Sequence, residues 1–452
     1  MSSSAYIEES DDARRQMQSF FAMAQLGYKE SLYLDVTARN DWSSTLAFTE
    51  RKSRGFFYPS VGLSWIIPKS FSMPSLISFG KVRASWSKVG NDIPLFVSNT
   101  VGHIAAGGIP QPNDTAPFGT LKPEMSSSFE IGTEWKFFDY RMDVDLTFYK
   151  TNTKNQLFSL PSSAGAAYKY YFVNAGNIQN MGVELTLGAV PILTNQFKWN
   201  TTLNFSRNKN EVKKLHDDLA SFIQGDEGFS SSYTMRLVEG GSFGDIYGKA
   251  FERDKYGAIV YGRDGLPQEI GSGNTAKVGN CNPAFLLGWG NSFTYKDFSF
   301  YFLIDGHFGG DVLAQTQAVL DQTGVSKVSG ETRTMGYVDL EGHHIYNIKG
   351  FYEQVGGRNG VTEYYMYDAT NIRLRELSLG YTLPKRLLGR KQFVKKAELS
   401  FVARNLFFIY KKAPFDPDAV LSASNSNQGI DIFGIPTTRS VGFNVKLSLI
   451  HI

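Results

Sequence analysis

The residues that could support covalent chemistry do not stand at spacings that would let them act together. The pair His343-His344 could bind a metal ion, but no further His or Cys lies at a spacing that supports a site. The single Cys281 cannot form a disulfide within the chain. No serine has a histidine at a suggestive place in the sequence. The sequence therefore predicts no catalytic residue, no metal site, no cofactor and no enzymatic activity.

Two further segments contain residue types that binding sites use. Phe415-Asp416-Pro417-Asp418 offers carboxylates to a calcium ion, but Asp and Pro in this pattern favour a turn. The Gly-rich segment from Gly240 to Gly248 lacks the G-x-G-x-x-G spacing of a phosphate-binding loop. Its glycines indicate a loop with a permissive backbone.

Carboxylates also gather on one face of the stretch from Phe129 to Tyr149. Asp143 and Asp145 alternate with apolar residues there, and Glu130 and Glu134 lie in the run just before them. A glycosidase would need two carboxylates about 5–9.5 Å apart in a substrate cleft. Alternation with period 2 is instead typical of a β-strand with two unlike faces, so we interpret these carboxylates as one polar face.

This stretch predicts a β-hairpin, because two alternating runs are separated only by Asp139-Tyr140. One face is apolar and ends in aromatic residues, and the other is polar and largely charged. A soluble sandwich would bury the apolar face, whereas a membrane barrel would turn it to lipid and the polar face to a wet lumen. One hairpin does not separate these two interpretations.

The composition permits a membrane barrel. The chain has 452 residues, of which 20% are charged and 14% aromatic, including 35 Phe and 23 Tyr. No run approaches the roughly 18 apolar residues of a membrane helix, but alternating strands cross a bilayer without one. The net charge of +3 is too weak to predict nucleic acid as a partner. The first residues have no charged-then-apolar signal pattern.

The links between predicted strands alternate between short and long along the whole chain. Tight turns are predicted at Lys29-Glu30, Asp139-Tyr140 and Lys296-Asp297. Long links are predicted at Gly90–Glu124, Thr151–Asn177, Asn208–Pro283 and Gly309–Tyr365, the last partly helical around Val312 to Gln322. A change of apolar phase between Leu374 and Leu377 predicts a β-bulge. Short periplasmic turns and long extracellular loops are the pattern of an antiparallel transmembrane β-barrel.

Aromatic residues supply the candidate binding positions. Aromatics in the predicted links could stack on a sugar ring or pack within the loops, and both roles stay open for Trp42, Tyr168, Tyr170, Tyr171, Tyr247, Tyr352, Tyr364 and Tyr365. Aromatics at strand ends are predicted to lie at the lipid interface, and these are Trp135, Phe137, Trp199, Trp289 and Tyr295.

Several blocks of sequence, in a fixed order, resemble the SusC/RagA-type TonB-dependent outer-membrane transporters of Bacteroidota. The blocks are YLDVTARNDWSSTL (Tyr33 to Leu46), FFYPSVGLSW (Phe56 to Trp65), GSFGDIYGKAF (Gly241 to Phe251), the segment from Val278 to Val312, YDATNIRLRELSLGYTLPKRL (Tyr367 to Leu387) and RNLFFIY (Arg404 to Tyr410). The resemblance implies import of glycan oligomers or peptides across the outer membrane. It also implies a SusD-like lipoprotein partner and energy from TonB.

The resemblance implies that this chain is a C-terminal fragment. Alternation gives about 13 strands, whereas such plugged barrels have roughly 22. The family's plug and TonB-binding segment have no counterpart here, so contact with TonB would come through a missing N-terminal part. We expect residues 1–446 to be barrel and residues 447–452, LSLIHI, to be a read-through tail.

A second hypothesis comes from a different class of protein. The same alternating strands could build a soluble β-rich carbohydrate-binding or structural protein. The two hypotheses differ in where the apolar strand faces go, since one exposes them to lipid and the other buries them in a core.

Overall fold

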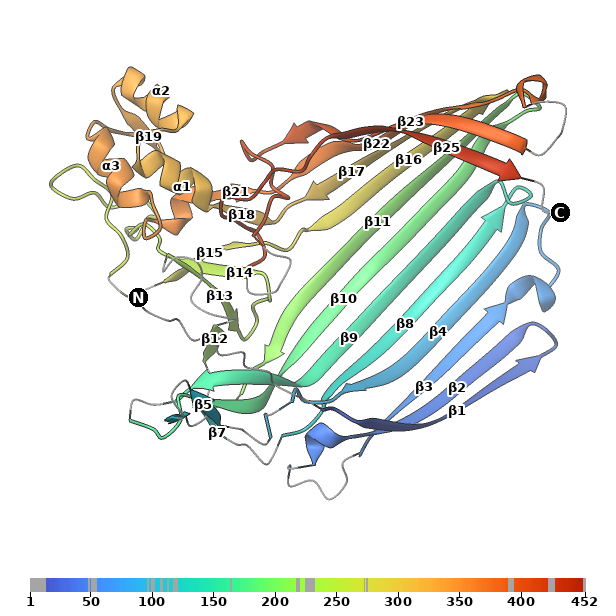
Figure 1. The fold of residues 1–452 in the computed structure, drawn as a ribbon, viewed down its shortest axis with the longest axis horizontal. Coiled ribbons are helices and arrows are strands. Elements are labelled where there is room, and N and C mark those ends of the chain that lie inside the picture. The colour runs from blue at the N-terminus through green and yellow to red at the C-terminus, as the bar shows by residue number, and fades with distance from the viewer. Residues whose placement is uncertain are drawn as a thin grey trace, which may run out of the picture. The chain divides into compact units, whose positions relative to one another are not determined.

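The computed structural model describes residues 14–47, 49, 55–95, 97–98, 102–105, 109–111, 114–116, 121–162, 165–216, 220–223, 232–271, 273, 275–388, 394–421 and 427–449. Its main feature is a 14-stranded sheet with the strand order β1-β2-β3-β4-β8-β9-β10-β11-β16-β17-β22-β23-β25, to which β7 adds by pairing with β10 (Figure 1). Strands that follow one another on this path also follow one another along the chain.

The strands on the path are mostly 10 to 24 residues long. Their bounds are β1 (Met17–Tyr28), β2 (Leu32–Ser43), β3 (Gly55–Ile66), β4 (Ile77–Asn91), β8 (Glu124–Phe137), β9 (Met142–Pro161), β10 (Tyr170–Leu193), β11 (Phe197–Lys214), β16 (Phe285–Tyr295), β17 (Phe298–Phe308), β22 (Asn371–Thr382), β23 (Val394–Lys411) and β25 (Ser440–Leu449).

Shorter elements occupy the links. The strands are β5 (His103–Ala105), β6 (Ile109–Gln111), β7 (Thr115–Ala116), β12 (Ser221–Ile223), β13 (Tyr233–Val238), β14 (Asp245–Gly248), β15 (Ala276–Asn280), β18 (Asp311–Ala314), β19 (Val338–Leu340), β20 (His343–Ile345), β21 (Met366–Asp368) and β24 (Ile430–Asp431). The helices are α1 (Gln315–Gln322), α2 (Lys327–Met335) and α3 (Ile348–Val355), with short 3-10 turns at Ser44–Leu46, Ile67–Lys69, Thr362–Tyr365 and Lys385–Leu387. None of these helices, within the part of the chain described, is long and apolar enough to cross a membrane.

The structure confirms the all-β class and the number of long strands. It also confirms the tight turns: Lys29 and Glu30 both have φ 50°, Asp139 and Tyr140 have φ 53° and 64°, and Lys296 has φ 53°. These positive φ values match the twist that a tight turn between antiparallel strands needs.

The predicted link Thr151–Asn177 is largely wrong, because β9 continues to Pro161 and β10 begins at Tyr170. The added length is held by polar cross-strand contacts in place of apolar ones. The hydroxyls of Ser126 and Thr153 lie 2.8 Å apart, as do those of Ser128 and Thr151. Such pairs stabilise a ladder without producing the apolar alternation that marks a strand in sequence.

The chain divides into two compact units. Unit 1 comprises Met1–Trp135, Thr147–Met181 and Asn210–Ala220, and unit 2 comprises Lys136–Leu146, Gly182–Lys209 and Ser221–Ile452. Within unit 1, a small buried cluster is formed by Leu46, Phe56, Ile93, Val97 and Leu121. Beside it the Asp92 carboxylate accepts hydrogen bonds from Arg15 and Thr45, both at 3.1 Å.

Unit 2 shows the two faces of the sheet in adjacent cross-strand rows. One row, which we call the apolar row, runs over β11, β16, β17, β22, β23 and β25 and contains Trp199, Phe293, Phe300, Leu379, Phe401 and Phe443. The next row, which we call the polar row, contains Lys198, Thr294, Ser299, Gly380, Ser400 and Asn444. Leu379 and Phe443 are 51% and 77% exposed, so the apolar row forms an outer surface of the protein.

The predicted β-bulge is confirmed at Arg375. On β17, Leu303 pairs with Glu376 and the next residue, Ile304, pairs with Leu374, so Arg375 has no residue opposite. The extra residue resets the alternation. Glu376 therefore shares a face with Leu303 and Asp305, and Leu377 returns to the apolar face of Phe302.

The two longest predicted links contain a packed body of their own in unit 2. We call it the loop module, and it consists of β12–β15, β18–β21 and α1–α3. Its core is made by buried residues from all parts of the module, including Tyr233, Met235, Ile246, Leu313, Phe351, Val355 and Tyr365. The predicted helix at Val312 to Gln322 is confirmed from Gln315 onward, while Val312 lies in β18. The prediction of irregular loops here is wrong, since a core of this size orders them.

The segment between β23 and β25 is fastened to the sheet by a buried arginine. Arg373, on β22, has a side chain that is only 1% exposed. Its guanidinium donates to Asp418 and, at 3.1 Å, to Thr437, lies 3.7 Å from Asp416 and stacks 4.4 Å from the centre of the Phe408 ring. Burial alone would raise the pKa of Asp416, but hydrogen bonds from Thr437 and Asp418 together with Arg373 hold it below its usual range.

Leu379→Arg should destabilise the protein by roughly 1–2 kcal/mol, between the costs of a lipid-facing arginine at the interface and at the bilayer midplane. Ser400→Arg, in the polar row, should be tolerated. The measurement is the temperature at which each variant loses its compact, fast-migrating form on an unboiled gel. Equal tolerance of both arginines would contradict the assignment of the two faces.

Arg373→Met should destabilise the segment from Ala413 to Thr437 by roughly 3–5 kcal/mol, because it leaves buried carboxylates without their cation. The measurement is the rate of tryptic cleavage after Lys411 and Lys412. The control is Arg404→Met, whose partner Glu376 lies 3.3 Å away in an exposed pair that should contribute only about 0–1 kcal/mol.

The contribution of Asp416 to the stability of this segment should also depend on pH. Since its folded-state pKa is lowered, the contribution is complete above the usual value of about 4 and is lost as the pH falls below it. Faster tryptic cleavage of the native protein after preincubation at acid pH, with no such change in Asp416→Asn, would support this. An equal acid response of both proteins would contradict it.

Candidate functional site

The predicted loop aromatics fall into two groups. In unit 1, Trp42 lies on β2 with 42% exposure, and Tyr168 and Tyr170 are 38% and 45% exposed at the start of β10, where Tyr171 is partly buried. Tyr170 and Tyr171 pair with Thr115 and Ala116 of β7. These four rings are at the ends of strands, and three of them present open faces.

The other four predicted loop aromatics belong to the loop module. Tyr352 and Tyr365 are 4% and 1% exposed, and Tyr364 packs edge-on against Tyr365 at 5.0 Å. Burial raises the pKa of all three hydroxyls. Tyr247 is partly buried under the Arg236 guanidinium, 5.2 Å away. The rings of Tyr352 and Tyr365 have no face open to a ligand in this structure, so they leave the set of candidates.

The predicted interface aromatics all lie on long strands. Trp135 and Phe137 are partly buried on β8, and Trp289 and Tyr295 are 42% and 50% exposed on β16. Trp199 stacks on Phe293 with ring centres 5.7 Å apart.

The indole N–H groups of two of these tryptophans are paired within the sheet. Trp199 donates to Asn291 and Trp289 donates to Thr201, each at 3.0 Å. A polar group facing hydrocarbon needs such a partner, so these pairs suit a lipid-facing surface.

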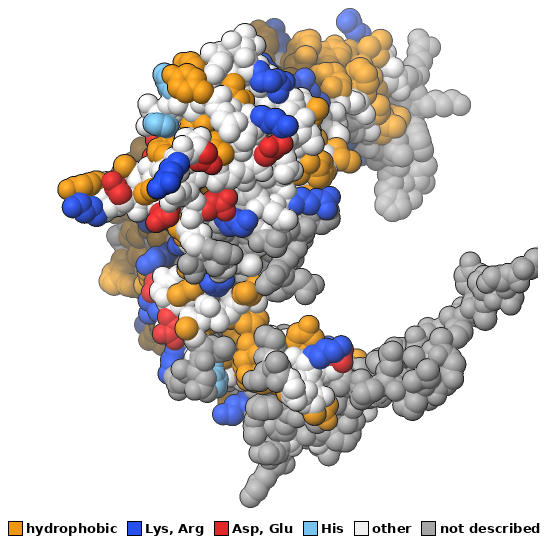
Figure 2. All heavy atoms as spheres, turned by 90° about the vertical axis from the view of Figure 1, so that its left-hand side faces the viewer, with side chains coloured by type: hydrophobic (Ala, Val, Ile, Leu, Met, Phe, Trp, Pro, Cys, Tyr) orange, Lys and Arg blue, Asp and Glu red, His pale blue; other side chains and the backbone are white. Residues whose placement is uncertain are grey.

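Charges on the loop module are mixed in sign. On α2 and α3, Lys327 lies 3.4 Å from Glu331 and Lys349 lies 3.7 Å from Glu353, each one helical turn apart. Figure 2 shows acidic and basic side chains interspersed over the face in view. The described residues of that face form no single-sign patch that would select a strongly charged partner.

Ser242 has a sequence context that resembles a catalytic motif. It stands in Gly240–Gly244, which has the G-x-S-x-G spacing of a nucleophile elbow. In the structure its polar atoms are occupied within a turn, since its Oγ accepts from Gly244 at 3.2 Å and from Asn280 at 2.6 Å, and its N–H donates to Asp245 at 3.0 Å. Ser242 therefore fixes a buried turn before β14.

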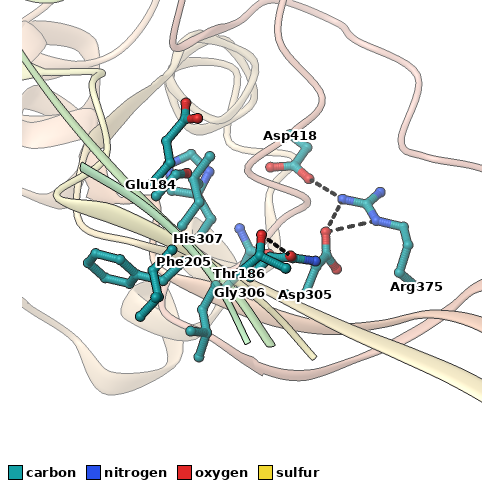
Figure 3. Close-up of a pocket in the computed structure, with 15 residues that line it drawn as sticks. Glu184, Thr186, Phe205, Asp305, Gly306, His307, Arg375 and Asp418 are labelled. Atoms are coloured by element: carbon teal, nitrogen blue, oxygen red, sulfur yellow. Dashed lines mark hydrogen bonds and ion pairs between the residues drawn. The ribbon is translucent and has the colours of Figure 1, made fainter. Parts of the chain in front are cut away.

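A cavity of about 470 Å³ lies in unit 2, over the middle of β10 and β11 and close to the ends of β16, β17 and β22 (Figure 3). Its polar lining residues come from four strands and one link, and they are Glu184, Thr186, Asn204, Ser206, Asp305, His307, Asn371, Arg375 and Asp418. Of these residues, only Asp418 lies in a segment that the sequence marked as a candidate, and there it was weighed as part of a calcium site or a turn.

Strand geometry explains how these side chains meet. Asn204 pairs with Gly288, and Gly288 pairs with Asp305, so all three share one face of the sheet. Thr186 joins the same row through a 3.0 Å hydrogen bond to Asn204. The signal in sequence is the pair Asp305 and His307 at alternate positions near the end of a largely apolar strand.

Three charged groups of the cavity, Asp305, Arg375 and Asp418, form a chain of ion pairs. Arg375, freed by the bulge, donates from Nε to Asp305 at 2.8 Å and from Nη1 to Asn405 at 3.2 Å. Asp418 lies 3.8 Å from Arg375 (Figure 3) and also pairs with Arg373. These groups are arranged to hold one another and a polar ligand through hydrogen bonds, which is binding chemistry.

Comparison with known proteins agrees with the strand pattern. A family model described as TonB dependent receptor-like, beta-barrel matches residues 3–406. TonB-dependent receptor P3 of Formosa agariphila is 26% identical over 487 aligned positions, covering 99% of this chain and 46% of that protein. TonB-dependent receptor SusC of Bacteroides thetaiotaomicron is 23% identical, covering 98% of this chain and 46% of its own length.

Solved structures show the same fold. The RagAB peptide transporter superposes with a TM-score of 0.75 at 19% identity, covering 96% of this chain and 47% of that one. The RagAB peptide importer in its 'open-open' state also gives 0.75, at 18% identity. The chain thus spans about half the length of the relatives that it matches.

These matches confirm the resemblance to SusC/RagA-type proteins and the prediction of an outer-membrane barrel. They favour the lipid-facing interpretation of the apolar row over the soluble one. The family consists of transporters rather than enzymes. The chain belongs to the TonB-dependent receptor family and forms part of its outer-membrane β-barrel.

Proposed function

We propose that residues 1–446 are the C-terminal barrel part of an importer that takes up glycan oligomers or peptides. A SusD-like lipoprotein would bind the substrate on the extracellular side, and TonB would supply energy through a part of the importer outside this chain. Outer-membrane lipid would surround the strands. No covalent step is required, since the substrate is held by many weak polar and stacking contacts.

The observation that carries this proposal is the apolar row. Six strands place large apolar side chains in register on one exposed face, while the neighbouring row is polar throughout. Water would be a poor solvent for such a surface, whereas the hydrocarbon of a bilayer suits it. The polar face is then free to line an aqueous path.

Two substrate classes are supported by different observations. The name of the RagAB structures refers to peptides. The exposed Tyr168 and Tyr170 offer aromatic faces of the kind that stack on sugar rings. Recognition is usually placed on loops and strand ends of a rigid scaffold, and these residues fit that place.

The test is uptake by cells with and without the gene. Fluorescent glycan oligomers and peptides should accumulate only in cells that carry it, and a protonophore should abolish the difference. Deletion of the gene for the proposed SusD-like lipoprotein should reduce uptake to a similar extent. Equal uptake in the deletion strain and its parent for both substrate classes would refute the proposal.

Replacing Tyr168, Tyr170 and Tyr171 together with Ala in the outer-membrane protein that contains this sequence should weaken substrate affinity by roughly tenfold or more. Each lost stacking contact is modest, and about 1.4 kcal/mol corresponds to a factor of ten. Calorimetry measures affinity, and a heat-shift gel measures stability, which should not change.

The control for this triple change is Tyr28→Ala combined with Tyr140→Ala. Both rings are 62% exposed, but they adjoin the tight turns, away from the long links. If affinity were unchanged in the triple variant, or lowered equally in the control, the prediction that the start of β10 contacts the substrate would be contradicted.

A further inference from the structure

The cavity of Figure 3 is lined at position 288 by a residue without a side chain. Gly288 lies in the row between Asn204 and Asp305, where its neighbours on both strands have side chains. A Cβ built at Gly288 would meet only Asn204, at 3.9 Å, which is ordinary contact. A larger residue would therefore fit the backbone here and would fill the hollow.

Two buried polar atoms at this cavity have no hydrogen-bond partner among the described residues. They are Oδ1 of Asp305 and Nε2 of His307. The other oxygen of Asp305 already accepts both Nε and Nη2 of Arg375. Leaving a buried carboxylate oxygen unpaired is costly, so Oδ1 of Asp305 favours a ligand that brings hydrogen-bond donors, while Nε2 of His307 can donate or accept.

The charge of the cavity favours a cation. Glu184, Asp305 and Asp418 line it beside a single guanidinium, that of Arg375. Adding Arg373 and Asp416, which complete the network behind it, four carboxylates face two guanidinium groups. Glu184 forms no ion pair with any described residue, and its carboxylate points upward in Figure 3.

The lining does not offer a platform for a neutral sugar ring. Phe205 pairs with Leu287, so its ring lies on the opposite face of the sheet from the row of Asn204, Gly288 and Asp305. Donor-seeking oxygens, surplus negative charge and no Phe, Tyr or Trp ring on the polar side of the lining match a primary ammonium group, which carries three donors and one positive charge.

From this arrangement we infer that the cavity is a subsite for the ammonium group of a peptide, at its N-terminus or on a lysine side chain. The inference rests on the proposed import function and narrows its substrate class to peptides. Asp305 accepts a hydrogen bond from the ammonium, Glu184 adds negative charge on the far side of the cavity, and the Arg373–Arg375 network holds Asp305 and Asp418 in place. Gly288 provides the room.

A competition between free and blocked amines tests this inference. The purified outer-membrane protein in detergent is mixed with equal amounts of a random hexapeptide library and the same library acetylated at every amine. Bound peptides are counted by mass spectrometry. The unmodified members should be enriched roughly tenfold, the ratio that corresponds to about 1.4 kcal/mol.

Gly288→Phe should bring the ratio close to one, and Asp305→Asn should lower it. The matched control is Gly62→Phe, a strand glycine in unit 1 whose added Cβ would meet only Asp35, at 3.8 Å. A heat-shift gel establishes that each variant is folded. Gly62→Phe should retain the full preference.

Equal binding of both libraries, no binding of either, or a preference that survives Gly288→Phe would overturn the inference. Binding of neutral oligosaccharides that Gly288→Phe abolishes would also overturn it, by assigning the cavity to sugars. None of these binding results contradicts the proposed import function, which is tested separately by the dependence of uptake on the gene. If uptake did not depend on the gene while the protein still preferred free amines, the import function would be refuted and the ammonium subsite would not.

Discussion

Backbone hydrogen bonding between neighbouring strands is the constraint on which this structure depends. In hydrocarbon every peptide N–H and C=O needs a partner, and a sheet supplies it through the adjacent strand. The same ladder sends successive side chains to opposite sides, so one sequence must satisfy two solvents at alternate positions. The apolar row from Trp199 to Phe443 and the polar row from Lys198 to Asn444 are the direct result. The indole pairs of Trp199 and Trp289 extend this rule to side chains.

The strands could be predicted wherever apolar and polar residues alternate, because one face of the sheet meets hydrocarbon and the other meets water. β17, β23 and β25 are predictable in this way, as are the tight turns and the bulge. This alternation disappears where both faces are polar, as at the end of β9 and the start of β10. Pairs of hydroxyl and amide side chains, such as Ser128 and Thr151, stabilise the pairing of the strands there. The loop module escapes prediction for a related reason. Its core gathers residues as distant as Tyr233, Phe351 and Ile430, and no local pattern marks them.

The candidate site was the least predictable part, since it depends on which residues face each other across strands. A glycine at position 288 is unremarkable in sequence and becomes a cavity only between Asn204 and Asp305. Likewise, Tyr352 and Tyr365 have the composition of ligand-stacking rings, yet the packing of α1, α3 and their neighbours buries them. Residue type thus indicated which chemistry was possible, while accessibility required the tertiary structure.

The bulge at Arg375 has a consequence for how this barrel tolerates change in length. In strict alternation from Arg373, the carboxylate of Glu376 would point into hydrocarbon and Leu377 into water; one unpaired residue reverses both. In a strand with one face in hydrocarbon and the other in water, odd-numbered and even-numbered positions are therefore not interchangeable. Insertions or deletions of two residues leave each later residue on its own face, whereas a single-residue change inverts every side chain beyond it unless a bulge absorbs the difference. Strand lengths in such barrels should accordingly drift during evolution in steps of two, with each odd step recorded as a bulge.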